Sequence, residues 1–181
     1  RAIVLRALAA PKSRHAVLRY RFNHLVGAVV NDTFPKVMSL CFANVPWRID
    51  RTWWYATMPN GSEIWFGGLD EKERVEKVLG NEYATILLNE VSQLPWASRN
   101  IALTRLAMRC PYKDAKGFER TLRLKMLYDE NPPSKAHWSY LLFVKKIDPE
   151  SKRPPDRPED YAEVAMNPDD NPDNLPAEYL A

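Results

Sequence analysis

Apolar and polar residues alternate along the chain in a pattern that predicts β-strands separated by helices. Residues 15–22 alternate apolar and basic side chains, which is typical of a half-buried strand. Residues 52–59 and 62–69 are two aromatic, β-prone runs, and the Asn60–Gly61 pair between them is a strong signal for a hairpin. Residues 84–90 form an almost continuous apolar run. Such a run favours a strand that is covered on both faces, as in a parallel sheet.

The remaining segments complete an alternation of strands and helices. A further strand is expected at residues 121–130, and the proline-rich residues 148–181 are typical of an extended or linker-like segment. Helices are expected at residues 1–9, 23–42, 70–80, 98–110 and 134–144. This order predicts an α/β fold with a mainly parallel sheet that is sandwiched by helices.

The charge of the chain is unevenly distributed. Residues 1–147 carry 23 basic and 13 acidic side chains, whereas residues 148–181 carry three basic and ten acidic ones. A basic body is consistent with a polyanionic partner such as nucleic acid. On charge alone, however, a solvated surface with surplus Lys and Arg is the simpler interpretation.

Cysteine content and hydropathy indicate which redox compartment the chain occupies and whether it spans a membrane. The two cysteines, Cys41 and Cys110, do not form a disulfide framework, so we expect a reducing compartment and buried thiols in apolar helices. No apolar run approaches the roughly 18 residues that a membrane span requires, so no membrane partner is expected.

Three of the predicted strands end in polar residues. These ends are Arg19 to Asn23, Asn89 to Glu90, and Asp129 to Asn131. If the strands are parallel, the three ends lie along one edge of the sheet, which is where open α/β sheets bind ligands. The sequence therefore predicts a candidate site that is built from three separate segments.

The end of the strand at residues 84–90 is typical of the Walker B element of P-loop ATPases, a buried strand that ends in two polar residues. In that element the first residue helps to hold Mg²⁺, and a following glutamate activates the water that attacks the γ-phosphate. The alternative interpretation is that Glu90 is a strand-end carboxylate that caps the next turn.

Three longer stretches of the sequence carry a recognisable series of motifs. They are PNGSEIWFGGLDEKERVEKVLGNEYATILLNEVSQLPW, residues 59–96, NPPSKAHWSYLLF, residues 131–143, and MNPDDNPDNLPAEYL, residues 166–180. They resemble, in turn, the Walker B region, the coupling segment and the exit from the ATPase core in the ATPase domain of phage terminase large subunits, the motors that package viral DNA. The matches occur in the family's order over most of residues 15–181. The resemblance therefore implies a P-loop NTPase-like fold.

The resemblance assigns roles to four residues. Glu90 matches the catalytic glutamate, and Asn131 matches the coupling position that senses the γ-phosphate. Asn89 stands where a metal-assisting carboxylate is common; its amide oxygen still binds water or Mg²⁺ but brings no charge, so Mg²⁺ is expected to be held less tightly. Arg19 matches a basic residue at the end of the strand after the P-loop helix, where it faces phosphate or a neighbouring subunit.

The phosphate-binding P-loop itself, G-x-x-x-x-G-K-[S/T], does not occur in the sequence. None of the six glycines is followed by Lys and then Ser or Thr. In the family this loop lies just before a helix like the one expected at residues 1–9. We therefore expect residues 1–147 to be a partial ATPase core that is truncated at the N-terminus, and residues 148–181 to lead toward a nuclease domain. On this interpretation the piece alone is inactive.

The resemblance implies a subunit of a viral DNA-packaging motor that couples ATP hydrolysis to translocation of double-stranded DNA into a procapsid. It further implies ATP and Mg²⁺ as cofactors, assembly into a homo-oligomeric ring, and a location in the host cell cytoplasm. The implied partners are double-stranded DNA, the portal protein of the procapsid and a small terminase subunit.

Two other hypotheses remain open on the sequence. One is a degenerate P-loop-like module that binds nucleic acid or a partner protein without hydrolysis, which the missing P-loop favours for this piece. The other is an adaptor held by the acidic, proline-rich residues 148–181, which only the composition supports.

Overall fold

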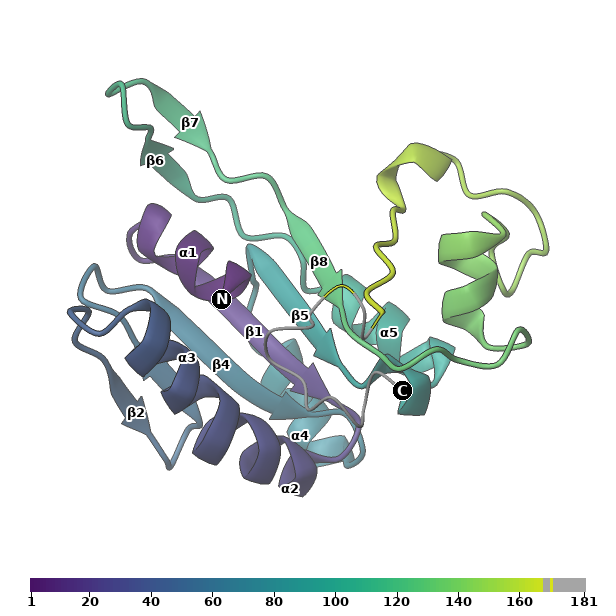
Figure 1. The fold of residues 1–181 in the computed structure, drawn as a ribbon, viewed down its shortest axis with the longest axis horizontal. Helices are drawn as coiled ribbons and strands as arrows, with labels where there is room; N and C mark the ends of the chain where they lie inside the picture. Colours follow the sequence, from purple (N-terminus) through teal and green to yellow (C-terminus); the bar gives the residue numbers. More distant parts are fainter. Residues whose placement is uncertain (168–169, 171–181) are drawn as a thin grey trace. The chain divides into compact units, whose positions relative to one another are not determined.

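The computed structural model describes residues 1–167 and residue 170. It divides into two compact units, Arg1–Pro132 and Pro133–Ala181. The first unit is built on a six-stranded sheet with the order β2-β3-β4-β1-β5-β8 (Figure 1). The strands are β1 (Arg14–Arg19), β2 (Arg48–Asp50), β3 (Tyr55–Thr57), β4 (Glu63–Gly68), β5 (Thr85–Asn89) and β8 (Lys125–Tyr128).

The centre of the sheet is parallel, as the sequence predicts. Strand β1 pairs in parallel with β4 and β5, and β5 pairs in parallel with β8. Strands β2, β3 and β4 are antiparallel, and the predicted turn joins β3 to β4. In that turn Gly61 has a φ of +77°, a left-handed conformation that glycine adopts without a steric cost.

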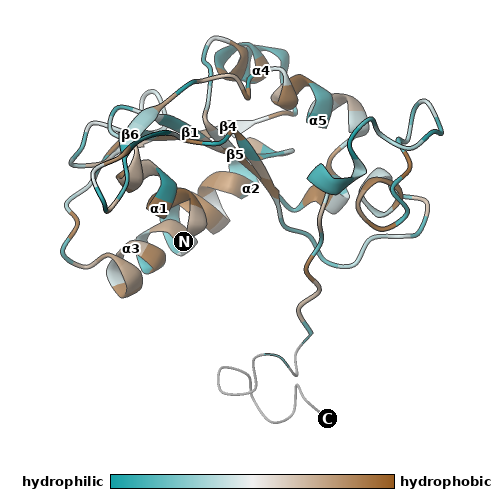
Figure 2. Cartoon of the chain, turned by 90° about the horizontal axis from the view of Figure 1, so that it is seen from above, coloured by the Kyte–Doolittle hydropathy of each residue, from teal (hydrophilic) through white to brown (hydrophobic). Residues whose placement is uncertain are grey.

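Helices cover both faces of the sheet. Figure 2 shows α1 (Ala2–Ala9), α2 (Phe22–Leu25) and α3 (Phe34–Cys41) on one face, and α4 (Lys72–Leu79) and α5 (Trp96–Leu103) on the other. The main core lies under the first group, where buried side chains of α1, α2 and α3 pack against β1, β3 and β4. Its largest members include Leu25, Phe34, Met38, Ile64 and Phe66. The predicted α/β sandwich is therefore confirmed.

The helix expected at residues 23–42 runs from Phe22 to Cys41 but changes its hydrogen-bond pattern. The segment Val26–Thr33 is a π-helix, and the Thr33 hydroxyl donates to the carbonyl of Ala28 at 2.8 Å. Pro35 follows directly in the first turn of α3. Because proline has no backbone N–H, it cannot continue the α-helical hydrogen bonds of the preceding turn, and the widened π turns accommodate this gap.

The segment between α5 and β8 differs from the prediction. The expected helix at 98–110 ends at Leu103, and the expected strand at 121–130 begins only at Lys125. Between them, β6 (Pro111–Lys113) and β7 (Glu119–Thr121) form a separate antiparallel hairpin, which Figure 1 shows extending away from the main sheet. The strand is interrupted because the N–H of Leu122 donates to the carbonyl of Cys110 at 2.8 Å, which fastens Leu122 to the base of the hairpin.

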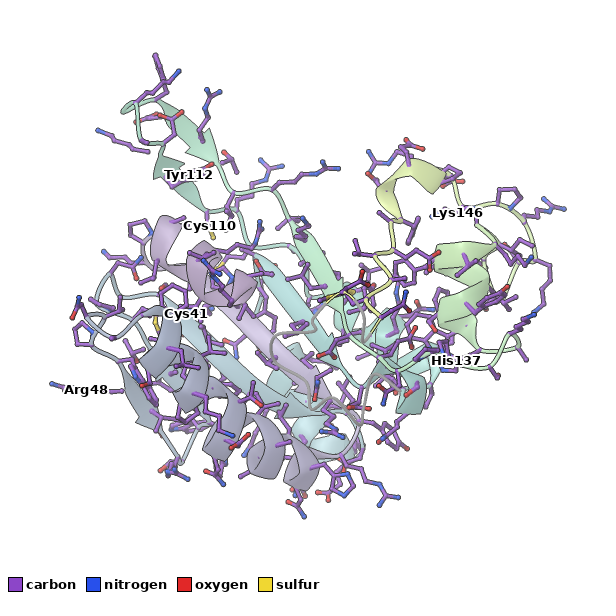
Figure 3. The ribbon with its side chains drawn as sticks, viewed as in Figure 1. Cys41, Arg48, Cys110, Tyr112, His137 and Lys146 are labelled. Atoms are coloured by element: carbon purple, nitrogen blue, oxygen red, sulfur yellow. The ribbon has the colours of Figure 1, made fainter. Side chains whose placement is uncertain are left out.

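The two cysteines lie in different parts of the first unit (Figure 3). Cys110 is buried at the base of the hairpin, outside any helix, whereas Cys41 is exposed at the end of α3. The expectation of two buried helical thiols is therefore wrong for the exposure of Cys41 and for the helical setting of Cys110. Cys41 is the last residue of α3, and the chain leaves the helix at Phe42.

The second unit contains little regular structure in its described residues. The helix expected at 134–144 is reduced to a short segment that includes the π-helix Tyr140–Val144, and a 3₁₀ turn follows at Pro158–Asp160. The ammonium of Lys146 donates to the carbonyl of Tyr161. The functional boundary expected between residues 147 and 148 stays a prediction, and both of its sides belong to this unit. The predicted exit segment, residues 166–180, falls almost entirely outside the described residues.

No helix within the described ranges is long and apolar enough to cross a membrane.

Candidate active site at the ends of three parallel strands

The carboxyl ends of β1, β5 and β8 meet at one edge of the sheet. In the parallel register Arg19 lies opposite Asn89, and Leu88 lies opposite Tyr128. The residues that end or follow these strands, Arg19, Asn89 and Asp129, are therefore neighbours. The structure thus brings together the three polar strand ends that the sequence predicts for one edge.

The amide of Asn89 lies between a cation and an anion. Its Nδ2 donates to both carboxylate oxygens of Asp129, each at 3.0 Å, while its Oδ1 accepts from Arg19 Nη1 at 3.4 Å. These neighbours fix which way the amide points, because the carboxylate requires a donor and the guanidinium requires an acceptor. The amide oxygen of Asn89 is thus already engaged by Arg19.

Glu90 follows Asn89 in an unusual backbone conformation. Its φ of 56° and ψ of 55° lie in the left-handed helical region, which costs a residue other than glycine about 1–2 kcal/mol. The flanking residues Leu88 and Val91 are buried, so the turn is anchored on both sides. Backbone strain of this kind is concentrated at functional sites, where surrounding structure holds the strained residue in place.

Asp129 contacts this strained turn through both its side chain and its backbone. The Glu90 N–H donates to Asp129 Oδ1 at 2.9 Å, and the Val91 N–H donates to the Asp129 carbonyl at 3.0 Å. The Asp129 N–H in turn donates to the carbonyl of Leu88 at 3.1 Å. Residues 88–91 are therefore fastened to β8 at each step of the turn that presents Glu90.

The other two predicted site residues are held less tightly. The Nε of Arg19 is buried and finds no hydrogen-bond partner within the described part of the chain. Asn131 is exposed, two residues after Asp129, and in the same described part no hydrogen bond joins it to Arg19, Asn89 or Glu90. The structure therefore connects three of the four predicted residues and leaves Asn131 beside them on the same segment as Asp129.

Comparison with known proteins places the chain in a family. The family model described as phage terminase large subunit matches residues 1–180. The chain belongs to the phage terminase large subunit family. No curated protein is similar enough to count as a match.

Solved structures of large terminases share the fold. The large terminase of a thermophilic bacteriophage superposes with a TM-score of 0.74 and 15% identity, covering 98% of this chain and 38% of that one. The same terminase in complex with ADP gives a TM-score of 0.67 at 16% identity, covering 96% and 37%. The large terminase ATPase domain of Thermus phage P74-26 gives 0.51 at 15% identity, covering 94% and 70%. The chain thus has the fold of terminase ATPase domains and spans well under half of the first of these terminases.

The donor groups at this edge fit the sparse protein ligation that is typical of Mg²⁺ beside a nucleotide. Within the described residues, no three His, Cys, Asp or Glu side chains gather into a cluster that holds a metal by itself. Mg²⁺ in ATPase sites usually keeps several waters and takes one or two carboxylates together with substrate phosphates. Among Arg19, Asn89, Glu90 and Asp129, the two carboxylates match that need, whereas the Asn89 oxygen accepts a hydrogen bond from the cationic Arg19.

Asp129 is the residue that sequence reasoning on individual positions missed. It appears in the sequence only as the first of the polar residues after a strand, and the resemblance drew attention to Asn131 instead. Its contact with Glu90 spans 39 positions of sequence and depends on the parallel pairing of β5 with β8. The signal that points to it is a carboxylate in the position directly after a parallel strand, beside a strand that ends in a neutral amide.

Proposed function

We propose that the chain is a part of a large terminase ATPase domain in which Glu90 is the general base of ATP hydrolysis. The observation that carries the proposal is the geometry of Glu90, a strained carboxylate residue at the end of a parallel strand and bound to the neighbouring strand end. A rigid strand end is a suitable support for a group that must direct an attacking water. The thermophilic bacteriophage terminase with the TM-score of 0.74, which shares the fold, has been solved in complex with ADP and with ATP-γ-S.

In this proposal the γ-phosphate of ATP lies beyond the carboxyl ends of β5 and β8. The Glu90 carboxylate accepts a proton from the water that attacks the γ-phosphate, and Asn131 senses whether that phosphate is present. Mg²⁺, when bound, neutralises negative charge on the phosphates. Asp129 would hold the ion, with Asn89 contributing through its contact to Asp129, and the Glu90 carboxylate would stay free to accept the proton.

Arg19 is proposed to face the nucleotide of its own chain. Its guanidinium is drawn toward the site by the hydrogen bond to Asn89, and its buried Nε is a donor without a partner in the described part of the protein. A buried unpaired donor is unfavourable, and a phosphate oxygen would satisfy it. Contact with a neighbouring subunit, the other role open to Arg19, has no such support.

At the level of the whole protein, we propose a packaging motor that uses ATP hydrolysis to move double-stranded DNA into a procapsid. Membership of the terminase large subunit family supports this role, and the basic residues 1–147 suit a polyanionic substrate. The proposed partners are DNA, the portal protein and a small terminase subunit, in a homo-oligomeric ring in the host cytoplasm. On this proposal residues 148–181 lead out of the ATPase core.

ATP turnover by the full-length protein that carries this chain tests the proposal. Glu90→Gln keeps the size of the side chain but cannot accept a proton, so turnover should fall by about 100-fold or more. Nucleotide binding, measured with a fluorescent ATP analogue, should be retained. Glu82→Gln is the matched control, because it removes an exposed carboxylate at the other end of β5.

The outcomes separate the two functions. Wild-type turnover that survives in Glu90→Gln would place the general base elsewhere. A wild-type protein that binds DNA but never hydrolyses ATP would favour the degenerate binding module instead.

A further inference from the structure

We infer that Asp129 is a positioning residue, whose carboxylate holds Glu90 in its catalytic conformation and supplies the negative charge that Asn89 lacks. The inference rests on the proposed function, because it concerns the same nucleotide site. On this inference the segment that carries Asn131 has two roles. It senses the γ-phosphate, and it orients the general base at the end of the neighbouring strand.

Asp129 makes two kinds of contact with the end of β5 and the turn that follows it. Its backbone N–H and carbonyl bond to Leu88 and Val91, continuing the ladder between β5 and β8. These bonds do not depend on the side chain. Only the carboxylate reaches the N–H of Glu90 and the amide of Asn89. Replacing the side chain therefore removes the hold on Glu90 while the strand pairing remains.

The backbone of Glu90 is strained. A left-handed conformation persists at a residue other than glycine only when its surroundings determine it. The Glu90 N–H donates a hydrogen bond to a carboxylate oxygen of Asp129 at 2.9 Å. Hydrogen bonds to an ionised acceptor are stronger than those between neutral groups. The carboxylate of Asp129 is thus one of the groups that hold the strained turn, and the only one of them that a side-chain substitution at position 129 removes. Glu90 is expected to lose its fixed direction without it.

The Asp129 carboxylate also brings negative charge to this edge of the sheet. The resemblance places a metal-assisting carboxylate on the strand that here ends in the neutral Asn89. In this chain a carboxylate lies directly after the adjacent strand instead, with both oxygens at 3.0 Å from the Asn89 amide nitrogen. The negative charge is therefore retained at the same edge of the sheet but comes from the segment that follows β8. The neutral Asn89 alone would hold Mg²⁺ weakly. With the charge of Asp129 beside it, the affinity for Mg²⁺ should be higher and should depend on Asp129.

Asp129 is also close to Asn131 along the chain. It lies two residues before Asn131, with which it shares the segment after β8. A movement of this segment when the γ-phosphate leaves would change the hydrogen bond to Glu90 directly. Sensing by Asn131 and catalysis by Glu90 are therefore joined through one carboxylate.

Steady-state kinetics of the full-length protein test the inference, with Asp129→Ala and Asp129→Asn compared to the wild type and to Glu82→Gln. Asp129→Ala should lower kcat by about 10–100-fold, while the KM for ATP at saturating Mg²⁺ changes little. The Mg²⁺ concentration for half-maximal rate should rise by about tenfold. Asp129→Asn keeps one oxygen for the Glu90 N–H but no charge. It should therefore recover part of kcat while keeping the raised Mg²⁺ requirement.

Amide hydrogen exchange provides a readout that does not depend on activity. In Asp129→Ala the Glu90 amide should exchange faster than in the wild type. The Val91 amide should be unchanged, because its acceptor is the backbone carbonyl of residue 129. This pair of amides is an internal control for unfolding, which would expose both.

Several results would overturn the inference. They are an unchanged kcat in a folded Asp129→Ala protein, an equal loss of kcat in Glu82→Gln, and unchanged exchange at the Glu90 amide. If Asp129→Ala does not fold, Asp129→Asn decides through its Mg²⁺ requirement alone, and an unchanged requirement refutes the charge role. A wild-type protein without any ATP turnover would instead refute the proposed function, and the exchange experiment would still test the positioning of Glu90.

Discussion

The strained backbone of Glu90 makes the relative stability of two substitutions at this position predictable. Glycine adopts the left-handed region freely, whereas alanine carries the same Cβ clash as glutamate. Both Glu90→Gly and Glu90→Ala remove the whole carboxylate, and both keep the N–H that donates to Asp129. The difference between the two variants therefore isolates the backbone conformation.

The magnitude follows from two opposing contributions. The left-handed conformation costs alanine about 1–2 kcal/mol, from which glycine is exempt. Glycine loses about 0.5–1 kcal/mol relative to alanine because its unfolded chain has more conformational freedom. The balance favours Glu90→Gly over Glu90→Ala by up to about 1.5 kcal/mol, with a central value of about 0.75 kcal/mol. For a chain of this length the central value corresponds to a melting temperature higher by about 2–3 °C.

Thermal denaturation of the two variants, followed by circular dichroism, measures this difference. Ser92→Gly and Ser92→Ala form the matched control pair, because Ser92 is exposed and lies in the right-handed 3₁₀ turn that follows Glu90. There alanine should be the more stable by about 0.5–1 kcal/mol. If alanine is also the more stable at position 90, Glu90 does not occupy a left-handed conformation in solution. The structural basis for its role as a held catalytic base would then be lost.

Three further predictions concern the fold that supports the site. Gly68→Ala should destabilise the protein by about 1–3 kcal/mol in denaturant titrations, because the added Cβ would lie 2.6 Å from Phe22 Cβ. Gly27→Ala should not destabilise the protein, because nothing lies within 4 Å of a Cβ added at Gly27. Equal losses of stability in the two variants would contradict the close approach of Phe22 to Gly68. Asn60→Ala should lower the free energy of unfolding by about 1–3 kcal/mol, because the Asn60 amide donates to two carbonyls at the end of α1, at 2.9 and 3.0 Å. An unchanged denaturation midpoint would refute this contribution of the two hydrogen bonds. Burial, reinforced by a nearby arginine, lowers the pKa of His15 from 6.5 to about 4, so between these values the unfolded chain binds a proton that the folded chain does not. The free energy of unfolding should therefore fall by up to about 3 kcal/mol as the pH is lowered from 6.5 to 4, and His15→Gln should flatten this dependence.

The elements that could be predicted are those whose burial shows in the local pattern of apolar and polar residues. The strand at Thr85–Asn89 is recognisable because it is apolar on both faces, as a strand in the middle of a covered parallel sheet must be. The hairpin of β3 and β4 is recognisable because Asn60–Gly61 supplies the turn. Both features depend on residues that are close in sequence.

The features that the sequence did not predict depend on distant contacts or on short exposed segments. Strands β6 and β7 have three residues each and are largely exposed, so no apolar alternation marks them. The interruption before β8 arises from the bond between Leu122 and Cys110, which no periodicity encodes. The contact of Asp129 with Glu90 depends on the order of strands in the sheet. That order is a tertiary property, so the site could be placed at one edge but its hydrogen bonds could not.

The direct test of the nucleotide site is an experimental structure of the full-length protein with ATP-γ-S and Mg²⁺ bound. We predict that the thiophosphate group lies beyond the carboxyl ends of β5 and β8, with the Glu90 carboxylate facing it and Asp129 still accepting the Glu90 N–H. A nucleotide bound away from these strand ends, or a Glu90 side chain directed away from the terminal phosphate, would contradict the assignment of Glu90 as the general base.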